Sequence, residues 1–148
     1  MIYIGSDHRG FEMKEKIKHW LDEGEYDHED MGPFEYNTDD DYPDFAQKVG
    51  ENVAADPGSR GILICGSGVG IDVAANKIDG VRAGSVSSPK QVIAAVHDED
   101  LNVISLASDF LSEEQAEEIV KAFLETHYEK TDRYERRLGK IEDLENNN

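Results

Sequence analysis

Cysteine and positively charged residues are both scarce in this sequence of 148 residues. Cys65 is the only cysteine, so an internal disulfide is impossible, and one cysteine among five scattered histidines gives no zinc-binding spacing. Lysine and arginine number 15 against 33 acidic residues, which leaves a formal net charge of −18. Such a surface repels phosphate backbones and anionic lipids, although it suits a salt-rich cytoplasm. We therefore expect no metal, no nucleic-acid partner and no membrane partner.

Long hydrophobic runs are also absent. No apolar run approaches the roughly 20 residues that a bilayer-spanning helix needs. The first ten residues, MIYIGSDHRG, begin with a strand-like segment rather than with a basic, apolar signal peptide. We therefore expect a cytoplasmic protein. The hydrophobic fraction of 38% suffices for one core, which predicts a single domain over residues 1–148.

Short runs rich in Ile and Val alternate with segments of helical period, a pattern typical of a parallel sheet covered by helices. We predict an α/β protein: a doubly wound, five-stranded parallel sheet of Rossmann or flavodoxin-like type, in three α/β/α layers. The third and fourth strands lack polar alternation and are expected at the centre of the sheet. The five predicted strands are Ile2–Gly5, Tyr26–Met31, Gly61–Cys65, Val81–Val86 and Val103–Leu106.

Helices are predicted between and after these strands. The first carries an apolar stripe from Phe11 to Leu21 and ends at Gly24, and Ser112 with Gln115 forms a capping box for the fifth. The last three residues, 146–148, are expected to fray. The later helices are expected at Asp44–Ala54, about Val69–Lys77, Pro89 to about Asp98, Ser112–Glu125 and about Asp132–Glu145.

The expected strand order is 2-1-3-4-5, the flavodoxin-like order. Ligands of such sheets bind beyond the carboxyl ends of the strands where connections leave to opposite faces, here between strands one and three. The two loops at that crevice are Ser6–Gly10 and Gly66–Gly70. The acidic run Asp39–Asp41 precedes the second helix and reads as a solvated loop, because it lacks the glycine and terminal glutamate of an EF-hand.

Cys65 ends a buried strand and enters a glycine loop that opens a helix. Backbone N–H groups at such a loop bind a phosphate or an oxyanion, and their positive field favours a thiolate. This pairing suits attack on an electrophile, or removal of a proton next to a carbonyl. A cysteine phosphatase would need arginine where Ile71 stands, and a dinucleotide fingerprint would follow the first strand. The alternative is an inert buried cysteine beside glycines that permit tight packing.

Other polar residues near the crevice have two readings each. Asp7 and His8 place a carboxylate and an imidazole opposite Cys65, or simply cap the first helix. Tyr42 could cover a small ligand, while Asn76 could be a second-layer donor or an ordinary polar residue.

Three of the six arginines lie within residues 133–137. Arg133 and Arg137 stand one helical turn apart and could clamp a phosphate dianion. The alternative is a solvated face paired with neighbouring acids.

The sequence resembles the ribose-5-phosphate isomerase B and galactose-6-phosphate isomerase family of sugar-phosphate isomerases. The resemblance extends from Met1 to about Ile141 and rests on IGSDHRGFEMK, DYPDFA, GILICGSGVGIDVAANKIDGVRAG and the closing R-x-x-x-R. It implies doubly wound subunits in a homodimer or tetramer, no cofactor, and aldose–ketose isomerisation through a cis-enediolate.

The resemblance also implies roles for individual residues. Cys65 would be the base that moves a proton between C1 and C2 of the sugar, and Asp7 would help to open the sugar ring. Ser67 and the loop amides would hold the enediolate oxygens, Tyr42 would line the sugar site, and a partner subunit would complete the site. The expected substrate-binding residues are His8, Tyr42, Gly66, Gly68, Val69, Gly70, Asn76, Arg133 and Arg137.

The sequence departs from the family pattern in two places. Asp98 and Glu99 occupy the positions of the family's ring-opening His-Asn pair, and His97 is displaced by one residue, about 100° around a helix. Asp109 stands where the family often carries a phosphate-binding arginine.

The default prediction is therefore an isomerase that interconverts ribose 5-phosphate and ribulose 5-phosphate. Isomerisation of another tetrose, pentose or hexose phosphate is an alternative. So is a catalytically silent, sugar-phosphate-binding subunit of a hetero-oligomer.

Overall fold

The computed structural model describes residues 1–148 and contains one sheet of five parallel strands. This confirms the predicted doubly wound α/β fold. The strands are β1 (Ile2–Ser6), β2 (His28–Asp30), β3 (Arg60–Cys65), β4 (Ala83–Ser85) and β5 (Val103–Ala107). Registers such as Ile4 opposite Ile62, and Ile62 opposite Ile104, align the apolar centres of β1, β3 and β5.

The strand order is β2-β1-β3-β5-β4, so the expected order 2-1-3-4-5 is wrong. β5 lies beside β3, and β4 is an edge strand of three residues, not a central one. Its middle residue is Gly84, and its valine neighbours Val81 and Val86 are buried outside the strand proper. A short strand of small residues suits an edge, whereas β5 supplies the continuous apolar run that a central position needs.

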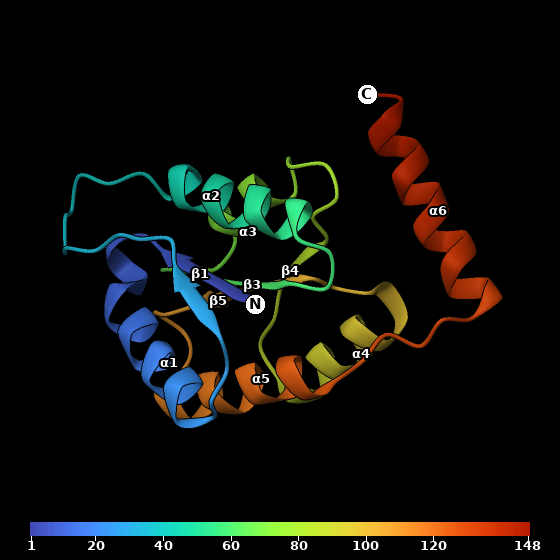
Figure 1. Cartoon of the computed structure of the whole chain (residues 1–148). Helices are drawn as coiled ribbons and strands as arrows, with labels where there is room; N and C mark the ends of the chain where they lie inside the picture. Colours follow the sequence, from blue (N-terminus) through green and yellow to red (C-terminus); the bar gives the residue numbers. More distant parts are fainter.

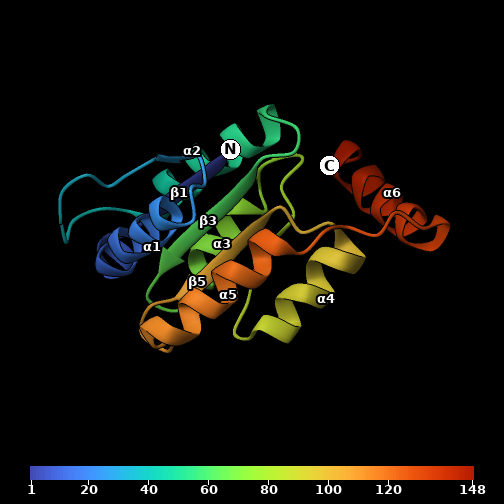
Figure 2. The same ribbon diagram turned by 60° about the horizontal axis from the view of Figure 1, so that its bottom comes forward.

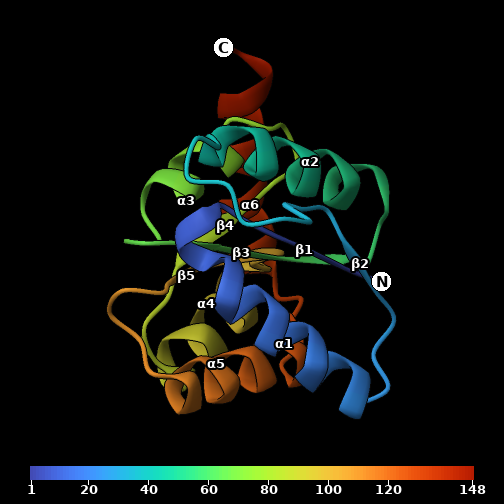
Figure 3. The ribbon, with the colours of Figure 1, turned by 90° about the vertical axis from the view of Figure 1, so that its left-hand side faces the viewer.

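The helices form one layer on each face of the sheet (Figures 1 and 3). α2 (Tyr42–Ala55) and α3 (Gly70–Ala75) cover one face, and α1 (Phe11–Glu23), α4 (Pro89–Glu99) and α5 (Glu113–Glu125) cover the other. Each layer has its own buried apolar cluster against the sheet. None of the helices is long and apolar enough to cross a membrane.

The two layers follow from right-handed crossovers. The connections from β2 to β3 and from β3 to β4 progress one way across the sheet and carry α2 and α3. The connections from β1 to β2 and from β4 to β5 progress the other way, so α1 and α4 lie on the opposite face. The chain therefore leaves β1 and β3 toward opposite faces, so the predicted switch point lies between them despite the different strand order.

Most helix boundaries lie within about two residues of those predicted, which is the ordinary uncertainty of a helix end. The capping box is present: Gln115 N–H donates to Ser112 Oγ, and Ser112 N–H donates to the Gln115 side chain. α3 is shorter than the predicted helix, since it begins at Gly70 and ends at Ala75, before Asn76.

The last helix, α6 (Asp132–Asn146), stands apart from both layers (Figures 1 and 2). It has no buried residue and extends one residue beyond the predicted end. Its contacts with the rest of the chain include Tyr134 packed edge-on against His97 of α4, and the Gly80 N–H donating to Glu145 Oε1 at 3.0 Å.

Candidate active site

Cys65 ends β3 and is buried, with its sulfur turned into the glycine loop that follows. The Gly68 N–H donates to Cys65 Sγ at 3.2 Å, and the Val69 N–H donates to Ser67 Oγ at 3.2 Å. Gly68 has a φ of +72°, a left-handed conformation that glycine adopts without strain. The loop thus directs the Gly68 amide at the Cys65 sulfur and the Val69 amide at the Ser67 hydroxyl.

The loop after β1 lies directly against β3. A Cβ on Gly10 would come within 2.6 Å of the Ile64 carbonyl oxygen, so glycine is required for this contact. The Asp7 N–H donates to that carbonyl at 3.2 Å, and the Asp7 side chain accepts from the Gly10 N–H at 3.1 Å. Asp7 therefore does cap the short 3-10 turn η1 (His8–Gly10), and this fixes its buried carboxylate beside the end of β3.

His8 is oriented by an aspartate that sequence reasoning assigned to a solvated loop. Asp40 Oδ1 lies 2.7 Å from His8 Nδ1 and also accepts from the His8 backbone N–H at 3.2 Å. The Asp40 side chain is only 8% exposed. Nε2 of His8 has no partner within the chain and is available to a ligand. The acidic run gave no signal for this role, because the pairing joins residues 32 positions apart.

Buried Lys14 anchors the segment that carries Asp40. Its ammonium donates to Asp30 Oδ2 at 2.7 Å and to the Pro33 carbonyl at 2.9 Å, where the chain leaves β2. The side chain has no exposure to solvent. This anchor fixes the start of the long connection between β2 and α2, whose Asp40 contacts His8.

Tyr42 and the loop after β5 close the crevice on two further sides. The Tyr42 ring packs on Gly70, where an added Cβ would lie 2.9 Å from the ring, and its side chain remains partly exposed. The Ser108 N–H donates to the Cys65 carbonyl at 2.9 Å, and the Asp109 N–H donates to the Gly66 carbonyl at 3.0 Å. Four segments distant in sequence therefore meet at the carboxyl end of β3 and the glycine loop that follows it.

The family model described as Ribose/Galactose Isomerase matches residues 2–141. The chain belongs to this family. A probable ribose-5-phosphate isomerase B of Mycoplasma pneumoniae is 41% identical over 140 residues, which cover 95% of this chain and 91% of that protein.

Solved structures of the family have the same fold. Ribose-5-phosphate isomerase B from Mycoplasma genitalium, with bound ribulose 5-phosphate, matches with a TM-score of 0.95 and 38% identity over 99% of this chain and 97% of the other. The enzyme from Clostridium thermocellum matches with a TM-score of 0.94 and 36% identity, over 99% and 97% of the two chains.

Within this one chain, the predicted site residues of α4 and α6 lie away from Cys65. His97, Asp98 and Glu99 end α4, which leads into the amino end of β5, whereas Cys65 lies at the carboxyl end of β3. Arg133 and Arg137 lie on α6, which stands apart from the sheet (Figure 2). A single chain therefore divides the predicted site into two groups.

His97 lies between two acids. Its Nδ1 is 2.6 Å from Asp98 Oδ1, and its Nε2 is paired with Glu129. The hydrogen bond with Asp98, and then that with Glu129, raises the pKa of His97 above its ordinary value. The partnership with His97 lowers the pKa of Asp98. The displaced histidine thus belongs to a charged cluster at the end of α4.

Asn76 supports the edge of the sheet. Its amide donates to the Ala83 carbonyl at 2.9 Å and accepts from the Ala83 N–H at 2.9 Å. The side chain thus pairs with β4 as a neighbouring strand would, which matches the reading of Asn76 as an ordinary polar residue.

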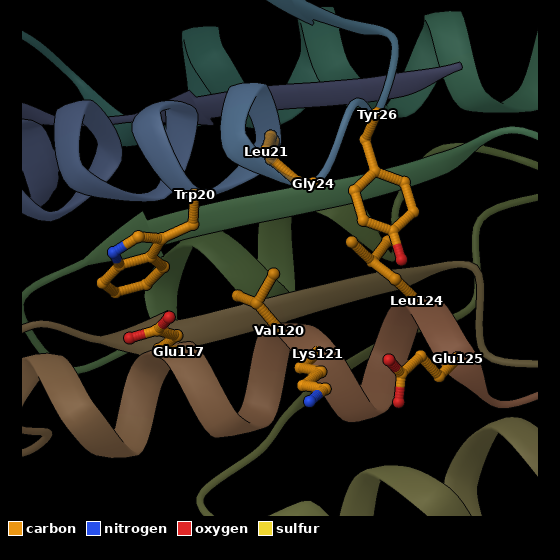
Figure 4. Close-up of a pocket in the computed structure, with 9 residues that line it drawn as sticks. All are labelled: Trp20, Leu21, Gly24, Tyr26, Glu117, Val120, Lys121, Leu124 and Glu125. Atoms are coloured by element: carbon orange, nitrogen blue, oxygen red, sulfur yellow. The ribbon is translucent and has the colours of Figure 1, made fainter.

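No group of three or more His, Cys, Asp or Glu side chains is arranged to hold a metal ion. A largely apolar hollow lies between α1 and α5 and holds none of the predicted site residues (Figure 4). Its lining is Trp20, Leu21, Gly24, Tyr26, Glu117, Val120, Lys121, Leu124 and Glu125.

Proposed function

We propose that this chain is an aldose–ketose isomerase that interconverts ribose 5-phosphate and ribulose 5-phosphate. The observation that carries the proposal is the Cys65 thiol, held by the Gly68 amide at the end of β3, where the Asp7–His8 loop and the Tyr42 ring pack on the same strand and glycine loop. Family membership over residues 2–141, and the relatives named as ribose-5-phosphate isomerases, support this substrate pair.

The chemistry needs one base and a set of oxygen-binding donors. The Cys65 thiolate takes the proton from C2 of the open-chain aldose, and the C–H electron pair becomes the C1–C2 double bond. Charge that develops on O1 is held by the amides of residues 66–70 and the Ser67 hydroxyl. The O2 proton passes to O1, the thiol returns its proton to C1, and O2 becomes the carbonyl of the ketose.

The loops around the sulfur supply the remaining roles. Asp7 assists ring opening from its fixed position in the η1 turn, and Tyr42 covers the sugar beside Gly70. His8 binds the phosphate through Nε2, because Asp40 occupies Nδ1. Asp40 is therefore a positioning residue in this proposal.

A second copy of the chain completes the site. Arg133, Arg137 and the end of α4 are separated from Cys65 within one chain, and α6 buries none of its residues. In a homodimer or tetramer, α6 of the partner brings the arginines to the open side of the crevice. The proposal also includes a cytoplasmic location, which cell fractionation would test.

Proton exchange tests the isomerase directly. Ribose 5-phosphate, erythrose 4-phosphate and allose 6-phosphate are offered separately in deuterated water and followed by NMR. We expect deuterium at C2 of ribose 5-phosphate, together with ribulose 5-phosphate. Exchange with a different sugar phosphate would instead assign that substrate. The altered positions Asp98 and Asp109 are the reason for including the other two sugars.

The same assay tests Cys65. Replacing Cys65 with alanine should lower kcat by about a thousandfold or more, because the base is lost. Calorimetry should show nearly unchanged binding of ribose 5-phosphate. Retained turnover in the variant would refute the assigned base. Binding by the wild-type chain without exchange of any sugar would instead favour a silent subunit that needs a different partner.

A further inference from the structure

The crevice around Cys65 is short of positive charge. The segments that surround it are residues 7–10, 31–42, 66–70 and 107–112, and Arg9 is the only lysine or arginine among them. The same segments contain Asp7, Glu35, Asp39, Asp40, Asp41 and Asp109. Within its own chain, a phosphate dianion that enters this edge therefore meets one permanent cation among several acids.

Arg9 is held at a defined place on the glycine loop. Its guanidinium lies over Gly66, where an added Cβ would come within 2.7 Å of Nη1 and closer still to neighbouring atoms. A carboxylate oxygen of Asp109 is paired with Nη2. The Ser108 Oγ lies 2.9 Å from the Arg9 carbonyl oxygen and 3.1 Å from the Cys65 carbonyl oxygen, so its one hydroxyl proton is shared between them. Backbone and side chain of Arg9 are thus both tied to the segment that follows β5.

Most donors of this guanidinium remain free. Asp109 is the only side-chain partner of Arg9 within the chain, and the Arg9 side chain is 54% exposed. A guanidinium has five N–H donors, so several stay available beside the first glycine of the loop. Pairing also offsets the charge of Asp109, which would otherwise repel a phosphate.

We propose that Arg9, oriented by Asp109, binds the phosphate group of the substrate and sets affinity for it. This inference rests on the proposed function for the identity of the substrate. It assigns to a residue of the first loop the positive charge that residue 109 does not supply. Arg9 acts with His8, its neighbour on the same turn, on one phosphate.

The test separates phosphate affinity from turnover. Arg9→Gln should raise both the KM for ribose 5-phosphate and the inhibition constant for inorganic phosphate by about tenfold to a hundredfold, the range for a lost charged hydrogen bond. The value of kcat should stay within about threefold, because the lost contact binds substrate and transition state alike. Arg9→Lys should retain part of the affinity.

A double variant distinguishes phosphate binding from a structural clamp. In Arg9→Gln, the unpaired Asp109 adds repulsion, so Arg9→Gln/Asp109→Asn should recover part of the lost affinity. Lys16→Gln is the matched control, because Lys16 forms a similarly exposed pair with Glu113 nearby, between α1 and α5. This control should leave both constants unchanged.

Three results would overturn the inference. They are an unchanged KM and inhibition constant in Arg9→Gln, an equal effect in Lys16→Gln, or a loss confined to kcat and Tm with no recovery in the double variant. Calorimetry with inorganic phosphate keeps the test independent of the reaction. If the wild-type chain isomerises no sugar, Arg9-dependent phosphate binding still upholds this site, and binding that is absent or independent of Arg9 refutes it.

Discussion

Single contacts between residues distant in sequence determine which side chains lie beside the predicted active site. Cys65 and the glycine loop are adjacent in the chain, so their association could be predicted from the sequence alone. The role of Asp40 could not, because it depends on how the connection between β2 and α2 returns to His8. The burial of Lys14 under that connection could not be predicted from the sequence either, since a lysine on a helix normally faces water.

Asp40→Asn should weaken substrate binding more than catalysis. Loss of the carboxylate removes the acceptor that orients His8 Nδ1, so we expect KM for ribose 5-phosphate to rise by about tenfold with kcat nearly constant. Steady-state kinetics measure both values.

Asp39→Asn provides the control, because it makes the same charge change one residue earlier on an exposed side chain. Equal effects of the two substitutions would show that the charge of the loop matters rather than the contact with His8. A fall in kcat alone would contradict the positioning role.

At the scale of elements, the two loops at the crevice were predictable, whereas the place of β4 was not. The crevice depends on the directions in which the chain leaves β1 and β3, and these stay the same in either strand order. The order itself depends on which of two apolar segments packs beside β3. Residues 103–107 are buried over most of their length, while Ala83–Ser85 presents small side chains that gain little from a central position.

The end of α4 should show a pH-dependent attachment to the segment before α6. The pKa of His97 is raised above its ordinary value of 6.5 by Asp98 and Glu129. A histidine with a raised folded-state pKa contributes its full stabilisation below about 6.5 and loses it as pH rises through the folded-state pKa. The lowered pKa of Asp98 keeps that carboxylate charged throughout this range.

Amide hydrogen exchange measures this attachment. Protection of the first turn of α6 should fall as pH rises above 6.5 relative to the reference rate, and His97→Gln should abolish that dependence. His19→Gln removes another exposed histidine–glutamate pair, with Glu23 on α1, and should leave it intact. A pH dependence that persists in His97→Gln would assign it to other groups.

At the scale of the whole molecule, the division of the predicted site into two groups makes a prediction about mixed assemblies. With ribose 5-phosphate far below its KM, Cys65→Ala and Arg137→Ala should each be nearly inactive alone, the first through loss of the base and the second through loss of phosphate binding. In a mixed homodimer, one site receives both substitutions and the other receives neither, so an equimolar mixture should regain about a quarter of the wild-type activity.

The mixing experiment needs dissociation and reassembly of the two variants, followed by the isomerase assay. Cys65→Ala mixed with Ser67→Ala is the control, since both residues lie on one loop, and no mixed assembly then contains an intact site. Activity that fails to return in the first mixture would show that Arg137 acts in its own subunit or elsewhere.

The isolation of α6 has a consequence for the cell. A helix of 15 residues with no buried side chain is marginal by itself in water, so its order depends on what it docks against. If that surface belongs to a second copy, each newly made chain is incomplete until it meets another. Catalytic output then grows more steeply than the number of chains when the protein is scarce, and the abundance of the protein becomes a control on its own activity.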